Sequence, residues 1–332
     1  MQNVKGVDMK IIIPVAGEGS RLRPHTHTIP KVLINIAGKP IISYIIEKLN
    51  KTPDSEFIFI LGYLGEKIKE FVISEFPENK FSFVFQKERQ GLGHAVSLAG
   101  EYIKPDDKVL IVLGDTIFDT DYSFLKEERS VLAVKKVDNP SRFGVAVVKE
   151  GRITKLIEKP KDFVSDLALV GIYYIKRWDI LKRSLEHIFK NNIRTKNEFQ
   201  LTDALEHMIQ NGEELVPHEI EGWFDCGKPE TLISTNKHLL SKNHIVTEVK
   251  NSVIIPPCFI PVSAQVENSI IGPYVSVGEN VIIKSSIIKN SIVDKDAEIY
   301  CVNLENSLIG GRALIKGHPR SLNVGDSSEV IF

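Results

Sequence analysis

The sequence predicts an α/β protein of two domains: a mostly parallel sheet with helices on both faces, followed by a left-handed parallel β-helix. Two observations lead to this prediction. Through about residue 240, short apolar runs alternate with stretches of helical periodicity. After Lys250, one tetrad recurs as NSVI, NSII, NSIV and NSLI. The predicted boundaries are residues 9–243 for the first domain and 250–332 for the second.

The N-terminal part has the order of elements that a crossover fold requires. We expect strands in MKIIIPVA (9–16), EFIFILGY (56–63), FSFVFQ (81–86) and KVLIVLGD (108–115), with a helix-like stretch after each of the first three. Such alternation favours a mostly parallel sheet covered on both faces. The later runs predict an added β-rich subregion and then two helices, at residues 131–137, 143–160, 167–176, 178–191 and 200–212.

The C-terminal part repeats at short intervals. Apolar residues recur six apart at Ile271, Val277 and Ile283, at Val293 and Ile299, and at Ile309 and Ile315. A six-residue period indicates a left-handed β-helix, in which each hexad supplies one short strand with one inward aliphatic side chain. The alternative is a few ordinary antiparallel strands.

Composition excludes several classes of protein. Of the 332 residues 42% are hydrophobic and 26% charged, and the net charge is −1, so no basic field would attract nucleic acid. No apolar run is long enough to span a bilayer, and the N-terminal MQNVKGVDMK reads as a short polar extension rather than a secretory signal. Three cysteines without paired or metal-type spacing favour a reducing, cytoplasmic setting: Cys226, Cys258 and Cys301.

The loop GEGSRLRP follows the first expected strand and carries both glycines and cations. It is neither a G-x-G-x-x-G fingerprint, because Leu22 replaces the third glycine, nor a P-loop. Gly17 and Gly19 would still let backbone N–H groups approach phosphate oxygens. Arg21 and Lys31 would add a guanidinium fork and a mobile charge. The alternative is a tight glycine turn with solvated cations.

Two acidic residues from distant segments could form one site together with that loop. Asp115 ends the apolar strand VLIVLGDT, and Asp225 lies in GWFDCGKPE. A carboxylate at a strand end is well placed to hold a divalent ion over the sheet edge. Together with the loop, the two acids are what a Mg²⁺–triphosphate site requires. Taken singly, Asp115 could be a turn former and Asp225 a cap beside buried aromatics.

In combination these segments resemble the sugar-1-phosphate nucleotidyltransferase family, also called nucleoside-diphosphate-sugar pyrophosphorylases. The resemblance covers residues 9–240, and the repeat domain with its end GHPRSLNVGDSSEVIF is similar to that of the long form of glucose-1-phosphate thymidylyltransferases. It implies a Rossmann-like catalytic domain. The motifs that carry it are GEGSRLRPHTHTIPKVL, QKERQGLGHAV, LGDTIF, FGVAVV with IEKP, VGIYYI, QLTDAL and DCGKPETL.

The resemblance implies a role for each matching position. The triphosphate and the nucleobase would be bound by Ala16, Gly17, Gly19, Ser20, Gln86 and Gly91. The sugar phosphate would be bound by Gly144, Glu158, Lys159 and Gly171, and Mg²⁺ by Asp115 and Asp225. The residues that assist catalysis would be Arg21, Lys31 and Lys159. For Glu158 and Lys159, the alternative is an exposed charged turn before Pro160.

Two positions depart from the family pattern. Ser20 stands where the family often has threonine, which keeps a hydroxyl group. Cys226 stands where W-x-D-T-G has threonine, so any role of that hydroxyl is lost here.

The implied reaction is Mg²⁺-dependent transfer of a nucleotidyl group to a sugar 1-phosphate, with release of pyrophosphate. The substrates expected first are dTTP and glucose 1-phosphate, with UTP as the alternative nucleotide. Two alternatives from other classes are a hexapeptide-repeat acyltransferase and a non-catalytic paralogue that binds sugar nucleotides. We expect a homo-oligomer that binds neither nucleic acid nor membrane, in which the β-helix has a structural role.

Overall fold

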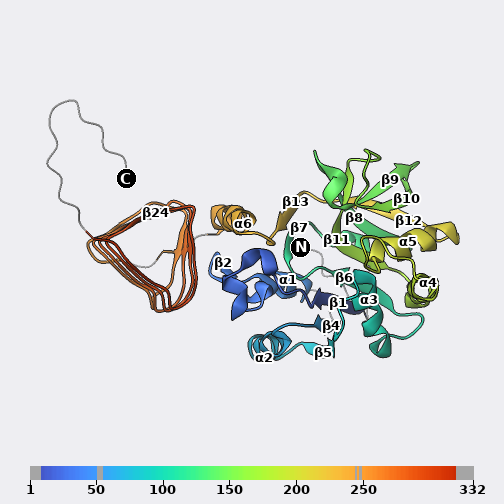
Figure 1. The fold of residues 1–332 in the computed structure, drawn as a ribbon, viewed down its shortest axis with the longest axis horizontal. Coiled ribbons are helices and arrows are strands. Elements are labelled where there is room, and N and C mark those ends of the chain that lie inside the picture. The colour runs from blue at the N-terminus through green and yellow to red at the C-terminus, as the bar shows by residue number, and fades with distance from the viewer. Residues whose placement is uncertain (1–8, 51–54, 244, 247–248, 319–332) are drawn as a thin grey trace. The chain divides into compact units, whose positions relative to one another are not determined.

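The computed structural model describes residues 9–50, 55–243, 245–246 and 249–318 (Figure 1). The expected N-terminal extension and the C-terminal end of the repeat domain, residues 319–332, lie outside them. Contacts divide the described chain into two units, residues 9–34 with 39–231 and residues 35–38 with 232–318. The predicted domain boundaries, 9–243 and 250–332, stay a prediction.

The first unit is built on a nine-stranded sheet, whose main path runs β10-β9-β11-β6-β1-β4-β5. Its parallel half pairs β1 with both β4 and β6, and β4 with β5. β11 runs antiparallel to β6, β8 and β9, so the sheet is mixed, and each of these antiparallel pairs includes a strand of the predicted β-rich subregion. The strands are β1 (Met9–Val15), β4 (Glu56–Leu61), β5 (Lys80–Phe85), β6 (Lys108–Val112), β8 (Ser130–Lys136), β9 (Gly144–Lys149), β10 (Arg152–Glu158), β11 (Leu167–Ile175) and β12 (Leu215–Glu219).

Apolar side chains cover both faces of this sheet, which confirms the α/β prediction. Along β1, Ile12 belongs to one buried cluster, whereas Ile11 and Ile13 belong to the other, because successive side chains point to opposite faces. The first cluster includes apolar residues of α3, α4 and α5, and the second those of α1 and α2. The helices are α1 (Ile41–Leu49), α2 (Gly65–Glu75), α3 (Leu92–Ser97), α4 (Trp178–Lys190) and α5 (Leu201–Gln210).

A small antiparallel pair stands beside the main sheet. β7 (Thr116–Asp119) pairs with β13 (Gly222–Asp225), and Asp225 lies opposite Thr116. This pairing joins two segments that are about a hundred residues apart in the sequence. The remaining short elements of the unit include the 3-10 turns η1 (Ser20–Leu22) and η3 (Lys31–Leu33) and the strand β3 (Lys39–Pro40). The strand β2 (Asn35–Ile36) belongs to the second unit.

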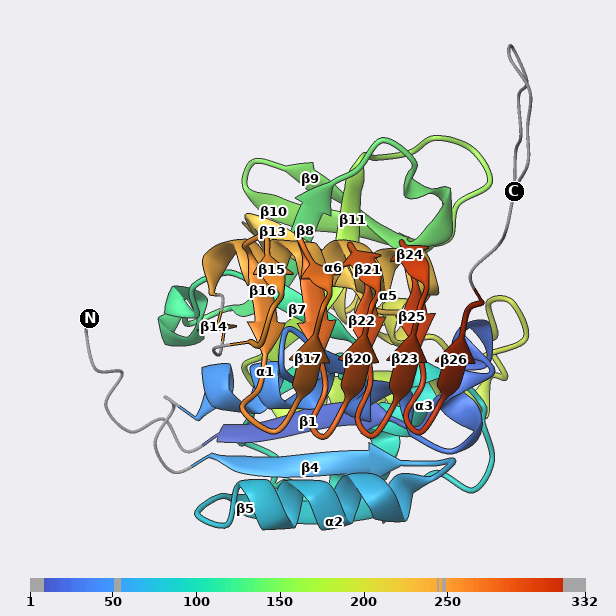
Figure 2. The same cartoon turned by 90° about the vertical axis from the view of Figure 1, so that its left-hand side faces the viewer.

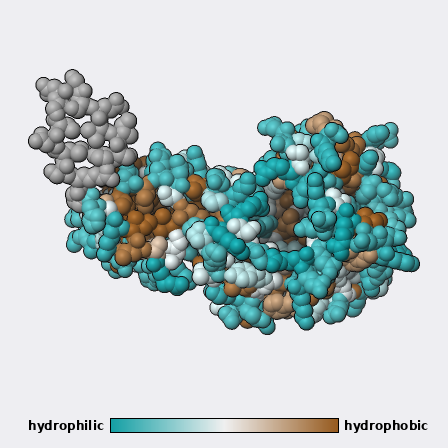
Figure 3. All heavy atoms as spheres, in the orientation of Figure 1, coloured by the Kyte–Doolittle hydropathy of each residue, from teal (hydrophilic) through white to brown (hydrophobic). Residues whose placement is uncertain are grey.

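The second unit is a stack of parallel strands in three sheets, which confirms the β-helix prediction (Figures 1 and 2). Several of its inward aliphatic residues, among them Ile271, Ile283 and Ile299, are fully buried. In the last described coil Ile309 is only half-buried, and apolar atoms show at the surface of the β-helix in Figure 3. The strands are β14 (Ile245–Val246), β15 (Val253–Ile254), β16 (Cys258–Ile260), β17 (Gln265–Glu267), β18 (Ile270–Ile271), β19 (Val275–Val277), β20 (Ile282–Lys284), β21 (Ile287–Lys289), β22 (Ile292–Val293), β23 (Glu298–Tyr300), β24 (Asn303–Glu305), β25 (Leu308–Ile309) and β26 (Leu314–Lys316).

The structure explains the repeated Asn-Ser pair. Asn251 and Asn268 turn the corners with φ of 47° and 51°, a left-handed conformation that asparagine tolerates better than most residues. The following serine links the coils, since Ser252 Oγ accepts a hydrogen bond from the Ser269 N–H (3.1 Å). The tetrads beginning at Asn290 and Asn306 occupy another corner, because β22 and β25 pair with each other in a different sheet.

Helix α6 (Pro229–Lys242) ends in the second unit and covers one sheet of the β-helix there. Its Asn236 is fully buried and accepts hydrogen bonds from Ser276 Oγ on β19 (2.6 Å) and from the Ala37 N–H (2.8 Å). These contacts explain why residues 35–38 group with the second unit.

Helices α4 and α5 meet through stacked imidazoles, which predicts a pH-dependent stability. The rings of His187 and His207 lie 3.9 Å apart, and burial, followed by His187, lowers the pKa of His207 from its ordinary 6.5. The unfolded chain therefore binds more protons than the folded chain between the folded pKa and 6.5, and stability falls as the pH falls through this range. We expect His207→Gln to reduce the loss of thermal stability between pH 7.5 and 5.5, measured by circular dichroism. An unchanged pH dependence would contradict this assignment.

Candidate active site

The loop after β1 lies at the carboxyl edge of the parallel strands. Gly19 has φ of 64°, and a Cβ there would come within 3.0 Å of Thr26 Cγ2 and 3.2 Å of Lys31 Cβ. Thr26 Oγ1 donates to the Gly19 carbonyl (2.9 Å) and holds this turn. Gly19 is therefore required by the backbone of the loop itself.

Gly17 is different, because a Cβ there would meet no atom within 4 Å. The open space beside it belongs to a cavity of about 280 Å³. This cavity contains six of the residues predicted for the site, namely Ala16, Gly17, Lys31, Gln86, Gly91 and Asp115. It is also lined by Pro14, Val15, Pro30, Val32, Arg89, Leu92, Ala95, Leu113 and Glu198.

A charge contact in the cavity joins Lys31 to Asp115. The ammonium group of Lys31 contacts Asp115 Oδ2, and the Lys31 side chain is only 13% exposed. Burial alone would raise the pKa of Asp115, but the charge and hydrogen bond of Lys31 hold it below its ordinary value. The Lys31 contact therefore favours the ionised form of Asp115, which is the form that metal binding requires.

The second predicted acid reaches the same edge through the β7–β13 pair. Asp225 lies opposite Thr116, the residue after Asp115, and the Cys226 N–H donates to the Asp115 carbonyl (3.1 Å). Arg21 reaches this point as well, since a Cβ at Gly227 would lie 2.9 Å from Arg21 Nη2 and 2.8 Å from Asp225 Oδ1. Two acids and an arginine from three segments thus meet beside the cavity.

This donor set fits a divalent cation of the Mg²⁺ type. Two carboxylates supply hard oxygen ligands, and Mg²⁺ is usually held by one or two carboxylates with substrate phosphates and water. Among the described residues, no group of three or more His, Cys, Asp or Glu side chains is arranged for a metal. An ion at Asp115 and Asp225 would therefore complete its coordination with phosphate oxygens and water.

At the other end of the cavity a buried amide meets a glycine turn. Gln86 is 8% exposed, and its Nε2 lies 3.0 Å from His94 Nδ1 and 3.4 Å from the Gly91 carbonyl. Gly91 has φ of 110°, and a Cβ there would lie 2.6 Å from the Phe199 carbonyl oxygen. This position cannot accept a side chain without moving the backbone.

Sequence reasoning missed one ion pair and one further acid around this cavity. Glu18, between the two loop glycines, forms an ion pair with Arg89, whose segment QKERQG was quoted without a role for the arginine. The pKa of Glu18 is lowered by that hydrogen bond and charge. Glu198 lines the cavity from the segment before α5, and no motif signalled it.

Three of the residues predicted for the sugar phosphate, Gly144, Glu158 and Lys159, lie together. Glu158 ends β10 opposite Gly144, and its side chain is only 8% exposed. Glu158 Oε1 lies 3.3 Å from Lys159 Nζ, and Oε2 accepts a hydrogen bond from Thr202 Oγ1 (2.7 Å). Gly171 has φ of 100°, and its carbonyl accepts the Leu113 N–H (2.9 Å), which ties β11 to the end of β6. None of the four predicted residues lines the cavity described above.

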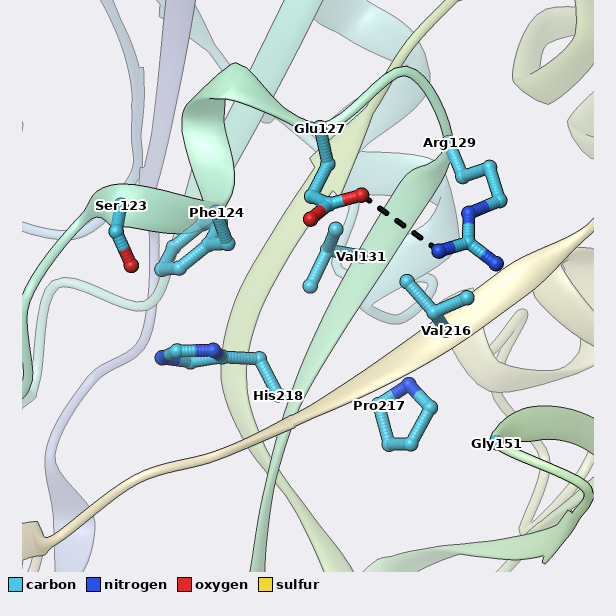
Figure 4. Close-up of a pocket in the computed structure, with 9 residues that line it drawn as sticks. All are labelled: Ser123, Phe124, Glu127, Arg129, Val131, Gly151, Val216, Pro217 and His218. Carbon is cyan, nitrogen blue, oxygen red and sulfur yellow. Dashed lines mark ion pairs between the residues drawn. The ribbon is translucent and has the colours of Figure 1, made fainter.

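A second cavity of about 360 Å³ shares no lining residue with the first (Figure 4). Val131, Val216 and Pro217 form its apolar side, with the Glu127–Arg129 ion pair across it. No residue predicted for the site contributes to it.

Comparisons with known proteins identify the family of this chain. The model of the nucleotidyl transferase family matches residues 10–242, and that of a GlmU-like C-terminal hexapeptide domain matches residues 227–316. The chain belongs to the nucleotidyl transferase family. The family resemblance predicted from the motifs is thereby confirmed, and with it the enzyme class.

Individual relatives of this nucleotidyltransferase match different shares of the chain. The Bifunctional protein GlmU of Methanocaldococcus jannaschii is 39% identical over 74% of this chain, which spans only 57% of that relative's length. A glucose-1-phosphate thymidylyltransferase of Streptomyces antibioticus is 30% identical over 97% of this chain and 99% of its own. The crystal structure of a UDP-glucose pyrophosphorylase with UDP-glucose has a TM-score of 0.59 at 25% identity and covers 71% of this chain and 100% of its own.

Gly17 and Gly91 differ in their surroundings, so substitution by alanine should have a different effect at each. Gly17→Ala should leave the thermal midpoint unchanged, because its Cβ meets no protein atom, and should raise the KM for nucleotide about tenfold if phosphates approach this backbone. Gly91→Ala should lower the thermal midpoint by several degrees, since it strains a left-handed backbone by ~1–3 kcal/mol. Differential scanning fluorimetry and initial rates would separate the two. The reverse order of stabilities would refute the geometry.

Proposed function

We propose that this chain catalyses Mg²⁺-dependent nucleotidyl transfer from a nucleoside triphosphate to a sugar 1-phosphate, giving a nucleoside-diphosphate sugar and pyrophosphate. Its first-choice substrates are dTTP and glucose 1-phosphate. The observation that carries the proposal is the cavity in which an open glycine backbone, Lys31 and Asp115 meet. The near full-length match to a glucose-1-phosphate thymidylyltransferase supports the choice of substrates.

The proposed reaction joins two anions, so its main barrier is charge repulsion. A phosphate oxygen of the sugar 1-phosphate attacks the α-phosphorus in line and expels pyrophosphate. That oxygen is already anionic near neutral pH, so no strong general base is needed. Arg21, Lys31 and Lys159 would stabilise the charge, and the glycine loop with Ser20 would align the triphosphate. Bound at Asp115 and Asp225, Mg²⁺ would supply further neutralisation of phosphate charge.

The nucleobase would lie near Gln86 and Gly91. A side-chain amide can pair with the edge of a pyrimidine, which suits both thymine and uracil. The fold shared with a UDP-glucose pyrophosphorylase keeps UTP as the second candidate. One methyl group separates the two bases, which is worth only ~1–3 kcal/mol in a pocket.

We assign the β-helix a structural role in a homo-oligomer. The alternative of acyl transfer has less support, because the described strands of the β-helix span only residues 245–316 and His318 is the sole histidine after residue 250 in the described chain. Binding of acetyl-CoA to the full chain would support that alternative. The described chain has no helix suited to crossing a membrane, and the three free cysteines agree with the proposed cytoplasmic setting.

The direct test is pyrophosphate release with Mg²⁺ and glucose 1-phosphate, with dTTP, UTP, CTP, GTP and ATP offered separately. We expect the fastest release with dTTP. A preference for UTP would keep the reaction and change the nucleotide. No release with any of the five, across several sugar phosphates, would refute the proposed function.

The metal assignment predicts that Asp115→Asn and Asp225→Asn each lower kcat by at least about a hundredfold, because each removes a charged ligand from the phosphate site. Asp106→Asn, at an acid that is 90% exposed, is the matched control and should retain activity. Circular dichroism would verify that all three variants fold. Near-normal rates in both site variants would contradict the assignment.

A further inference from the structure

The motif QLTDAL has no role in the reaction as proposed, yet it places one side chain against the residues predicted for the sugar phosphate. Its Thr202 is the second residue of α5 and is only 6% exposed. Thr202 Oγ1 donates a hydrogen bond to Glu158 Oε2 at 2.7 Å. A hydroxyl group carries a single proton, so this bond commits it to one oxygen of the carboxylate.

The contacts around Glu158 distinguish its two oxygens. Oε2 is enclosed, since a Cβ at Gly144 would lie 2.9 Å from it and 3.0 Å from Thr202 Oγ1. Oε1 lies 3.3 Å from Lys159 Nζ, on a side chain that is 40% exposed. One oxygen is therefore held from inside the protein, and the other faces the lysine proposed to hold the sugar phosphate.

The position of Thr202 is itself fixed by hydrogen bonds on its N-terminal side. Three residues earlier, the Phe199 N–H donates to the Gln90 carbonyl and the Phe199 carbonyl accepts the Gly93 N–H, both at 2.8 Å. The next residue, Asp203, accepts a hydrogen bond from Thr195 Oγ1 (3.2 Å). The start of α5 is thus attached to the turn that borders the nucleotide cavity.

We propose that Thr202 is a positioning residue for the sugar subsite: it holds Glu158 so that Oε1 accepts a hydroxyl of the hexose 1-phosphate. This inference rests on the proposed function. Thr202 acts through Glu158 and touches neither reacting phosphate. If Thr202 had a purely structural role, it would only supply the hydrogen-bond donor that any buried carboxylate needs. The two roles differ in which substrate is affected when the hydroxyl is removed.

The test compares Thr202→Val, which keeps the shape and removes the donor, with Thr202→Ser, which keeps the donor. Initial rates of pyrophosphate release are measured on the full chain while each substrate is varied in turn. Thr202→Val should raise the KM for glucose 1-phosphate about tenfold or more and leave the KM for the nucleotide within about twofold. Thr202→Ser should restore the sugar KM to within about threefold of the wild type. Thr154→Val removes an exposed hydroxyl on β10 and is the matched control.

A wild-type sugar KM in Thr202→Val, or an equal rise in both KM values, would overturn the proposal. A variant that leaves Glu158 Oε2 without a donor could fold poorly, so the substitution is also examined in a Glu158→Ala background, where this buried carboxylate is absent. There Thr202→Val should not weaken glucose 1-phosphate binding further. An additional loss of several-fold would show that Thr202 acts by another route.

Titration calorimetry with glucose 1-phosphate separates this inference from the proposed function. If the wild type releases no pyrophosphate but binds the sugar phosphate, the proposed function fails, and the ratio of Kd values for Thr202→Val and wild type decides the role of Thr202. If the wild type neither reacts with nor binds any sugar phosphate, both proposals fail.

Discussion

The ion pair between Lys31 and Asp115 is the contact on which the candidate site depends. It joins the segment after β1 to the end of β6, two neighbouring parallel strands, across 84 positions of sequence. Breaking a partly buried pair leaves a charge without a partner, which is far more costly than the net value of the pair itself. The pair therefore favours one arrangement of the two loops. It also keeps a cation and an anion ready at the point where phosphates and a metal ion would meet them.

Glycines complete that arrangement in a way that side chains could not. Gly19, Gly91 and Gly171 have positive φ values, and a Cβ at any of them would come within about 3 Å of a neighbouring atom. Gly17 has neither constraint, so the protein interior does not account for it. The backbone of the site is consequently fixed at the three glycines that the fold requires. It leaves open space at Gly17, which the fold does not require. This division supports the view that the space beside Gly17 is kept for a ligand.

Much of the fold and part of the site could be predicted from the sequence, because local patterns carried them. The strand at residues 9–15 and the inward Ile271, Ile283 and Ile299 follow from periodicity alone. Asp115 and Asp225 could be proposed for one phosphate and metal site from the sequence, and the resemblance implied that they are its metal ligands. The pairing of β7 with β13, which brings their segments together, is a long-range contact. Glu18–Arg89 and Thr202–Glu158 could not be predicted, since both depend on which loops the sheet brings together. The sequence around a charged or hydroxyl-bearing residue does not indicate which distant residue it will contact.

The serine ladder of the β-helix has a consequence for how such a chain can change over evolutionary time. Ser252, Ser269 and Ser286 each accept an N–H from the following coil, so three successive coils offer the next the same acceptor. Insertion of a whole coil by gene duplication would reproduce these bonds at both of its borders. Insertion of a partial coil would shift the register and turn aliphatic residues outward. Whole turns can therefore be added to this domain without breaking the contacts between coils, whereas partial turns cannot.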